Sequence, residues 1–136
     1  MKIYTDVKKF YNRLNVGVVL LGDHDQIYLE RAIQVCEEDE FKGHLEGIKG
    51  ALSFVKNMEP LYAKNDAEAI FECNERNFVA NALRKDPYVK MINKRLGINV
   101  NIVEPRFVND NYYLTIARNA SRIKYEQLFH QGNIFE

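Results

Sequence analysis

The chain has 136 residues and a mass of 15.9 kDa, a length that predicts a single domain spanning residues 1–136. Hydrophobic residues make up 46% and charged residues 28%, as in globular proteins, which excludes disordered, fibrous and low-complexity classes. Nineteen basic side chains balance nineteen acidic ones, so any contact with nucleic acid has to be made by a local patch.

The sequence shows no sign of export or of membrane insertion. Residues 1–10 contain three lysines and no apolar run, and the longest apolar stretch, residues 16–21, is far shorter than the ~20 residues of a membrane span. Cys36 and Cys73 lie far apart and form no CxxC pair, so we expect both to be reduced thiols in the core. We therefore expect a cytoplasmic protein without a metal or another cofactor.

Residues 1–40 are expected to form two helices on either side of one strand. Thr5 can cap a helix whose apolar residues recur at spacings of three and four as far as Leu14. The apolar run at 16–21 predicts a buried strand. Asp23 and Gln26 have the spacing of a capping box, which predicts a second helix that ends near the acidic residues 37–40.

A further helix is predicted to start near Asp39, because acidic residues are favourable in a first turn, and to stop before Pro60. Its apolar residues step by four, three, four and three positions; they are Phe41, Leu45, Ile48, Leu52 and Val55. This spacing is typical of a face that packs on another element.

The opposite face of this helix carries a stripe of glycines at positions 43, 47 and 50. Each glycine in a helix interior costs about 1 kcal/mol relative to alanine. The stripe predicts a close approach to this face by another helix of the chain, a second subunit or a partner backbone. The alternative is that the helix tolerates the cost of Gly43, Gly47 and Gly50 without such a contact.

The second half of the chain is expected to contain helices at 65–85 and 86–96, a strand at 98–104 and a helix at 119–130. Asp86 and Pro87 have the residue types of an N-cap and a first helical position, and Gly97 follows as a stop signal. Residues 112–117 fit either a strand or a helix. The predicted fold is a predominantly helical α+β domain, compact, with about five or six helices and a small two- or three-stranded sheet.

Residues 78–96 carry five basic side chains against one acidic side chain and are the main candidate binding surface. The basic residues are Arg84, Lys85, Lys90, Lys94 and Arg95. A basic second helix after a short turn has the outline of a DNA-binding helix pair, although this turn contains no glycine. The surface fits nucleic-acid phosphate, an acidic protein or a merely solvated helix face, and we rank a protein partner above nucleic acid.

Acidic pairs suggest a catalytic alternative. None of the three histidines follows a glutamate by three positions, which excludes a four-helix di-iron site. The pairs Glu37 with Glu40 and Glu72 with Glu75 have the spacing with which helical carboxylates hold Mg²⁺ in all-α nucleotide pyrophosphohydrolases. A second, weaker candidate site is the segment 23–25, two aspartates around a histidine where a strand is expected to end.

No phosphate-binding loop, dinucleotide fingerprint or nucleophile motif is present in the sequence. The leading hypothesis is therefore a small interaction or accessory protein without a catalytic site, which binds a macromolecular partner through the basic residues. Its size and its richness in asparagine and lysine are compatible with a virus or phage protein. The alternative is a Mg²⁺-dependent enzyme resembling the nucleotide pyrophosphohydrolases.

Overall fold

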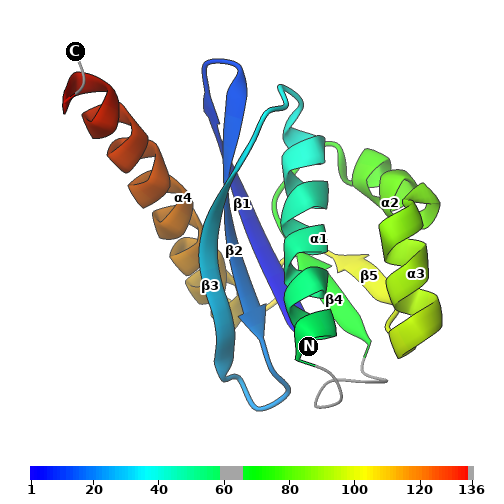
Figure 1. Ribbon diagram of the computed structural model, residues 1–136. Helices are drawn as coiled ribbons and strands as arrows, with labels where there is room; N and C mark the ends of the chain where they lie inside the picture. The colour runs from blue at the N-terminus through cyan, green and yellow to red at the C-terminus, as the bar shows by residue number, and fades with distance from the viewer. Residues whose placement is uncertain (59–65, 135–136) are drawn as a thin grey trace.

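The computed structural model describes residues 1–58 and 66–134, with the side chains of the last helix described as far as Arg122. A five-stranded mixed sheet lies at its centre, in the order β3-β2-β1-β4-β5 (Figure 1). The first three strands form an antiparallel meander, and the last two run parallel to β1. Their bounds are β1 Lys2–Phe10, β2 Arg13–Leu21, β3 Ile27–Val35, β4 Ala67–Ile70 and β5 Val100–Val103.

Four helices are seen in the described residues: α1 Glu40–Asn57, α2 Arg76–Lys85, α3 Pro87–Leu96 and α4 Val108–Ile134. The first three helices share a large core with one face of the sheet, and α4 packs on the other face through a second, smaller core (Figure 1). The alternation of β1 separates the two cores, because Ile3 faces α1 whereas Tyr4 faces α4. No helix in the described part of the chain is both long and apolar enough to cross a bilayer.

The expected predominantly helical architecture is wrong, since the structure is α+β around a five-stranded sheet. The segment predicted as a helix capped by Thr5 is β1, and the helix predicted after Asp23 is β3. The capping-box spacing belongs instead to a hairpin turn, in which the Gly22 N–H donates to the Gln26 carbonyl and Asp25 takes φ 61°. The strand predicted at 16–21 is confirmed and begins earlier, at Arg13.

Predictions based on end signals agree better with the structure. The helix that starts near Asp39 is confirmed as α1, and the helix from Pro87 to Leu96 is confirmed as α3. Asp86 caps α3 by accepting hydrogen bonds from the next two N–H groups, and Gly97 takes the left-handed conformation. Residue 65 lies outside the described residues, and the remainder of the helix predicted at 65–85 divides into β4 and α2.

The strand predicted at 98–104 is confirmed as β5. Residues 112–117 belong to α4, so the structure decides in favour of the helix at this position. The helix predicted at 119–130 is the continuation of α4.

Candidate active site

Polar side chains from three segments meet where β4 leaves the sheet. β4 pairs with β1 only as far as Tyr4, so Thr5 and Asp6 lie beyond the paired end. The chain after β4 then passes through residues 71–75 into α2, and α1 begins at the same end of the sheet (Figure 1). The end of β4 thus leaves room for side chains of β1, α1 and the β4–α2 connection to approach one another.

Asp6 is the innermost carboxylate of this group and faces α4. Its Oδ1 lies 3.6 Å from Nε of Arg118, and its Oδ2 accepts a hydrogen bond of 3.3 Å from the Ser121 hydroxyl. Burial raises the pKa of Asp6, and the charge of Glu72 acts in the same direction, against the lowering effect of Arg118. The arrangement therefore places a partly desolvated carboxylate beside an arginine and a second carboxylate.

Glu40, the first residue of α1, adds a further carboxylate. Partial burial raises its pKa, and the charges of Glu75 and Asp6 raise it further. Together with Glu72, these residues bring four carboxylates from β1, α1 and the β4–α2 connection within electrostatic reach of one another. Such mutual repulsion is relieved by a proton or by a cation.

His44 lies one turn after Glu40 and is almost completely buried, with 1% of its side chain exposed. Its Nδ1 lies 2.8 Å from the Thr5 hydroxyl, and its ring stacks on Phe71 with the centroids 4.4 Å apart. Burial lowers the pKa of His44 to about 4, so the ring is neutral at pH 7. Thr5 and Phe71 together hold a neutral imidazole in one orientation.

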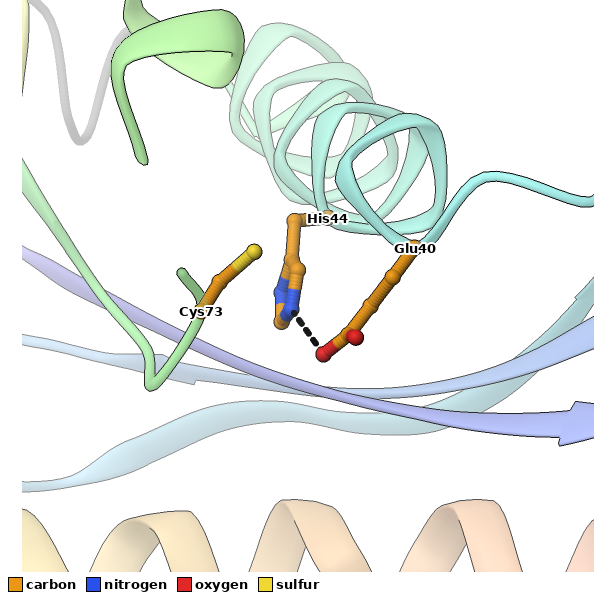
Figure 2. Close-up of side chains that lie close together, drawn as sticks. All are labelled: Glu40, His44 and Cys73. Carbon is orange, nitrogen blue, oxygen red and sulfur yellow. Dashed lines mark ion pairs between the residues drawn. The ribbon is translucent and has the colours of Figure 1, made fainter. Parts of the chain in front are cut away.

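Cys73 stands across from His44, in the connection after β4. Its Sγ accepts a hydrogen bond of 3.3 Å from the Glu75 N–H, and burial raises the pKa of the thiol. Figure 2 shows the side chains of Glu40, His44 and Cys73 converging from α1 and from this connection. Cys36, by contrast, is exposed, so the expectation that both cysteines lie in the core is wrong for Cys36.

The acidic pairs singled out in the sequence are placed differently from the prediction. Glu37 precedes α1, and Glu72 and Glu75 lie in the connection before α2, so the helical spacing does not occur. Glu40, Glu72 and Glu75 nevertheless belong to the carboxylate group described above. Asp23 lies in the β2–β3 turn, beside the start of β1, where it forms an ion pair of 2.9 Å with the N-terminal amino group.

Sequence reasoning missed Asp6, His44 and Cys73. Asp6 was hidden because the spacing of the apolar residues around it was interpreted as helical. The available signal was the alternation of the β-branched residues Ile3, Thr5 and Val7, which is typical of a strand and places Asp6 on the opposite face.

The predicted basic residues all lie on the surface of α2 and α3; they are Arg84, Lys85, Lys90, Lys94 and Arg95. Arg84 and Lys90 line a groove of about 730 Å³ between these helices and β5, together with the side chains of Asn93, Asn99 and Asn101. This groove combines positive charge with amide groups that donate and accept hydrogen bonds.

The glycines of α1 face two different environments. Gly43 and Gly47 lie against β1 and β2, where an added Cβ would come within 3.0 Å of Leu14 and 2.9 Å of Val16, respectively. Gly50 has no neighbour closer than the Ile33 side chain at 4.0 Å. Two of the three glycines thus bring α1 close to its own sheet.

No protein-family model matches the sequence, and no curated protein does. Solved structures do resemble it. An RNase H1 isolated from compost by a metagenomic approach superposes with a TM-score of 0.63 over 91% of this chain and 96% of that chain, at 16% sequence identity. The same RNase H1 in complex with an RNA/DNA hybrid superposes with a TM-score of 0.64 over 91% of this chain and 98% of that chain, also at 16% identity. The RNase H1 of the halophilic archaeon Halobacterium salinarum superposes with a TM-score of 0.55 over 88% of this chain and 95% of that chain, at 17% identity.

The chain has an RNase H-like fold. This finding overturns the hypothesis of a helical accessory protein, because the structures that share the fold are nucleases. It equally overturns the all-α pyrophosphohydrolase alternative, since the RNase H-like fold is built on a mixed sheet.

Proposed function

We propose that the protein hydrolyses phosphodiester bonds of nucleic acid at the group formed by Asp6, Glu40, Glu72 and Glu75. The observation that carries the proposal is the convergence of these four carboxylates from three separate segments of an RNase H-like fold. An RNA/DNA hybrid is the first substrate to test, because one of the similar structures holds that ligand.

The carboxylates fit a divalent cation, since burial and, to a smaller extent, the neighbouring carboxylates raise the pKa of Asp6 and Glu40, and a cation would stabilise their charged forms. Asp6 and Glu72 offer the oxygen ligands that Mg²⁺ prefers. Such a cation supplies a bound water of lowered pKa and neutralises charge on the phosphate. Arg118, beside Asp6 and half exposed, adds a fixed positive charge that attracts a phosphate oxygen.

The basic residues of α2 and α3 provide the binding surface in this proposal. They are exposed and contact phosphates, which orients the nucleic acid without reading its bases. The asparagines of the groove between α3 and β5 add hydrogen bonds to sugar and phosphate. Nucleic acid therefore replaces the acidic protein that the sequence analysis ranks first, in line with structures of similar proteins bound to an RNA/DNA hybrid and to double-stranded DNA.

The test is cleavage of a labelled RNA/DNA hybrid, duplex DNA and single-stranded RNA in the presence of Mg²⁺, Mn²⁺ or Zn²⁺. Asp6→Asn keeps the shape of the side chain and its hydrogen bond with Ser121 but removes the charge. We expect it to lower the cleavage rate by roughly 100-fold or more. Asp25→Asn is the matched control, because Asp25 is exposed in the β2–β3 turn, and it should leave the rate unchanged.

Two results would contradict the proposal. One is the absence of cleavage of all three substrates by the folded protein with each of the three metals. The other is cleavage that Asp6→Asn and Asp25→Asn affect equally, because the activity would then arise elsewhere or from a contaminant.

A further inference from the structure

Nε2 of His44 is one of four buried side-chain atoms in the described residues that have no hydrogen-bond partner; the others belong to Asn15 and Gln34. Only 1% of the His44 side chain is exposed, so water cannot easily supply the missing hydrogen bond to Nε2. The nearest acidic atom is Oε1 of Glu40 at 3.6 Å, which is too long for a hydrogen bond. A buried nitrogen of this kind is unfavourable unless a group absent from the protein satisfies it.

The other ring nitrogen shows why Nε2 has a free lone pair. Nδ1 lies 2.8 Å from the Thr5 hydroxyl, and the ring is stacked on Phe71, so the orientation of the imidazole is fixed. When Nδ1 donates its proton to the Thr5 oxygen, Nε2 is an acceptor that points toward the Glu40 carboxylate (Figure 2). A hydrogen bond from the second ring nitrogen is the usual support of a metal-binding histidine.

Two further ligand atoms stand next to the His44 ring. A carboxylate oxygen of Glu40, a ring nitrogen of His44 and Sγ of Cys73 form a group whose members are all within 4.8 Å of one another, and Nε2 itself lies 3.6 Å from Oε1 of Glu40. Glu40 and His44 are four positions apart on α1 and so share one face of the helix. The Glu75 N–H donates a hydrogen bond of 3.3 Å to Sγ of Cys73, which holds the sulfur in this position.

We infer that Glu40, His44 and Cys73 bind Zn²⁺ through the carboxylate, Nε2 and Sγ. Imidazole and thiolate ligands select Zn²⁺ over Mg²⁺ and Ca²⁺, which prefer oxygen alone. Ligand atoms of a tetrahedral zinc site lie about 3.3 to 3.8 Å apart. Oε1 of Glu40 lies 3.6 Å from Nε2, which is already within this range, and the Glu40 side chain is 51% exposed.

With three protein ligands, the fourth position of the ion is open. Water or a further carboxylate would complete the coordination, and Glu75 is one such group, since it lines a hollow of about 210 Å³ together with Glu40. The ion joins α1 to the connection between β4 and α2. The inference concerns binding alone and does not depend on the hydrolysis proposed above.

The experiment uses the full chain, stripped of metal by a chelator and then titrated with Zn²⁺. We expect one Zn²⁺ per chain, measured by elemental analysis after gel filtration, and a rise in Tm of about 10 °C at a hundredfold excess over Kd. Co²⁺ in place of Zn²⁺ should give the charge-transfer absorption of a cobalt–thiolate bond, which reports Cys73 directly.

The two cysteines provide a matched pair of variants. Cys73→Ser should abolish the charge-transfer band and lower the Zn²⁺ affinity at least tenfold. Cys36→Ser removes an exposed thiol outside the group and should change neither. Glu40→Gln tests the ligand at the surface, where folding is not at risk, and should also weaken binding at least tenfold.

The inference is wrong if the folded protein retains less than one Zn²⁺ per chain at micromolar concentrations. It is also wrong if Co²⁺ binds without the thiolate band, or if Cys36→Ser and Cys73→Ser lose Zn²⁺ equally. Zinc binding by a protein that cleaves no nucleic acid would support this inference and contradict the proposed function.

Discussion

Gly17 on β2 is the residue at which the sheet and α4 come closest. A Cβ added there would lie 1.7 Å from the carbonyl oxygen of Ala117, a backbone atom that no change of rotamer can move. Ala117 and Ser121, both small and buried, line the same side of α4. This contact brings α4 near enough for Ser121 and Arg118 to reach Asp6, so a residue without a side chain positions part of the candidate site.

Gly17→Ala should therefore destabilise the protein by about 3 kcal/mol or more, because the overlap can be relieved only by moving α4. Gly50→Ala is the matched control, since its nearest neighbour lies 4.0 Å away. Alanine at that helical position should stabilise the protein by up to about 1 kcal/mol. Urea denaturation measures the free energy of unfolding, which should fall for Gly17→Ala and rise for Gly50→Ala. Equal changes in the two variants would contradict the packing described here.

At the level of elements, α3 has the best-defined start in the structure. The Asp86 carboxylate accepts hydrogen bonds from the N–H groups of Tyr88 and Val89 and lies 3.1 Å from the ammonium group of Lys49 on α1. Burial alone would raise the pKa of Asp86, but Lys49 and the two N–H groups outweigh it and hold the pKa below its ordinary value. Asp86 thus links a helix cap to the packing of α1 and α3.

Asp86→Ala should lower the free energy of unfolding by about 1 to 2 kcal/mol at pH 7. A carboxylate whose pKa is lower in the folded state stabilises above its unfolded pKa, and this contribution is lost as the pH falls through the folded pKa. The difference between wild type and variant should therefore shrink below about pH 4. Denaturation curves from pH 3 to 7 measure it, and a difference that is constant with pH would exclude the charge of Asp86 as the cause.

Elements with a clear local signal, such as α3 and the alternating residues of β5, could be predicted from the sequence, whereas β1, β3 and β4 could not. α3 has its cap, its proline and its terminal glycine within a few residues, and its bounds were predicted correctly. The apolar residues of β1 and β3 have the spacings of three and four that predict a helix, because such spacings arise by chance in strands that are buried on both faces or only partly buried. Their partners on β2 and β4 lie outside any local window.

The candidate site, like the fold, could be predicted only in part from the sequence. Glu40, Glu72 and Glu75 attracted attention through their spacing, although the reason was wrong, whereas Asp6 depended on recognising β1 as a strand. His44 and Cys73 are ordinary core residues in the sequence. Only the crossover that brings β4 beside β1 places Cys73 opposite His44.

On the scale of the whole molecule, charge is divided between two regions, one at the end of the sheet where α1 begins and one on the surface of α2 and α3. Carboxylates gather where α1 begins, and basic residues cover α2 and α3. An overall charge of zero is therefore compatible with strong local binding of an anionic polymer.

Replacing both Lys90 and Lys94 by Gln should flatten the dependence of log affinity on log salt concentration by about two units, because two phosphate contacts are lost. Fluorescence anisotropy with an RNA/DNA hybrid at several salt concentrations measures the slope. Arg13→Gln combined with Arg31→Gln, two exposed positions on the β1–β3 meander, removes the same charge and should leave the slope unchanged. An unchanged slope for the lysine variant would place the binding surface elsewhere.

The parallel pairing of β1 with β4 also determines the order in which the molecule can be built. The β1–β2–β3 meander needs only hairpin contacts, which form in microseconds, whereas Lys2 meets Glu68 only after a long loop has closed. Parallel pairings of this kind are slow steps in folding. Since Cys73 is placed opposite His44 only when β4 joins β1, a chain that has completed the meander alone has no assembled ligand set, and uptake of zinc in a refolding experiment would report the joining of β4 to β1.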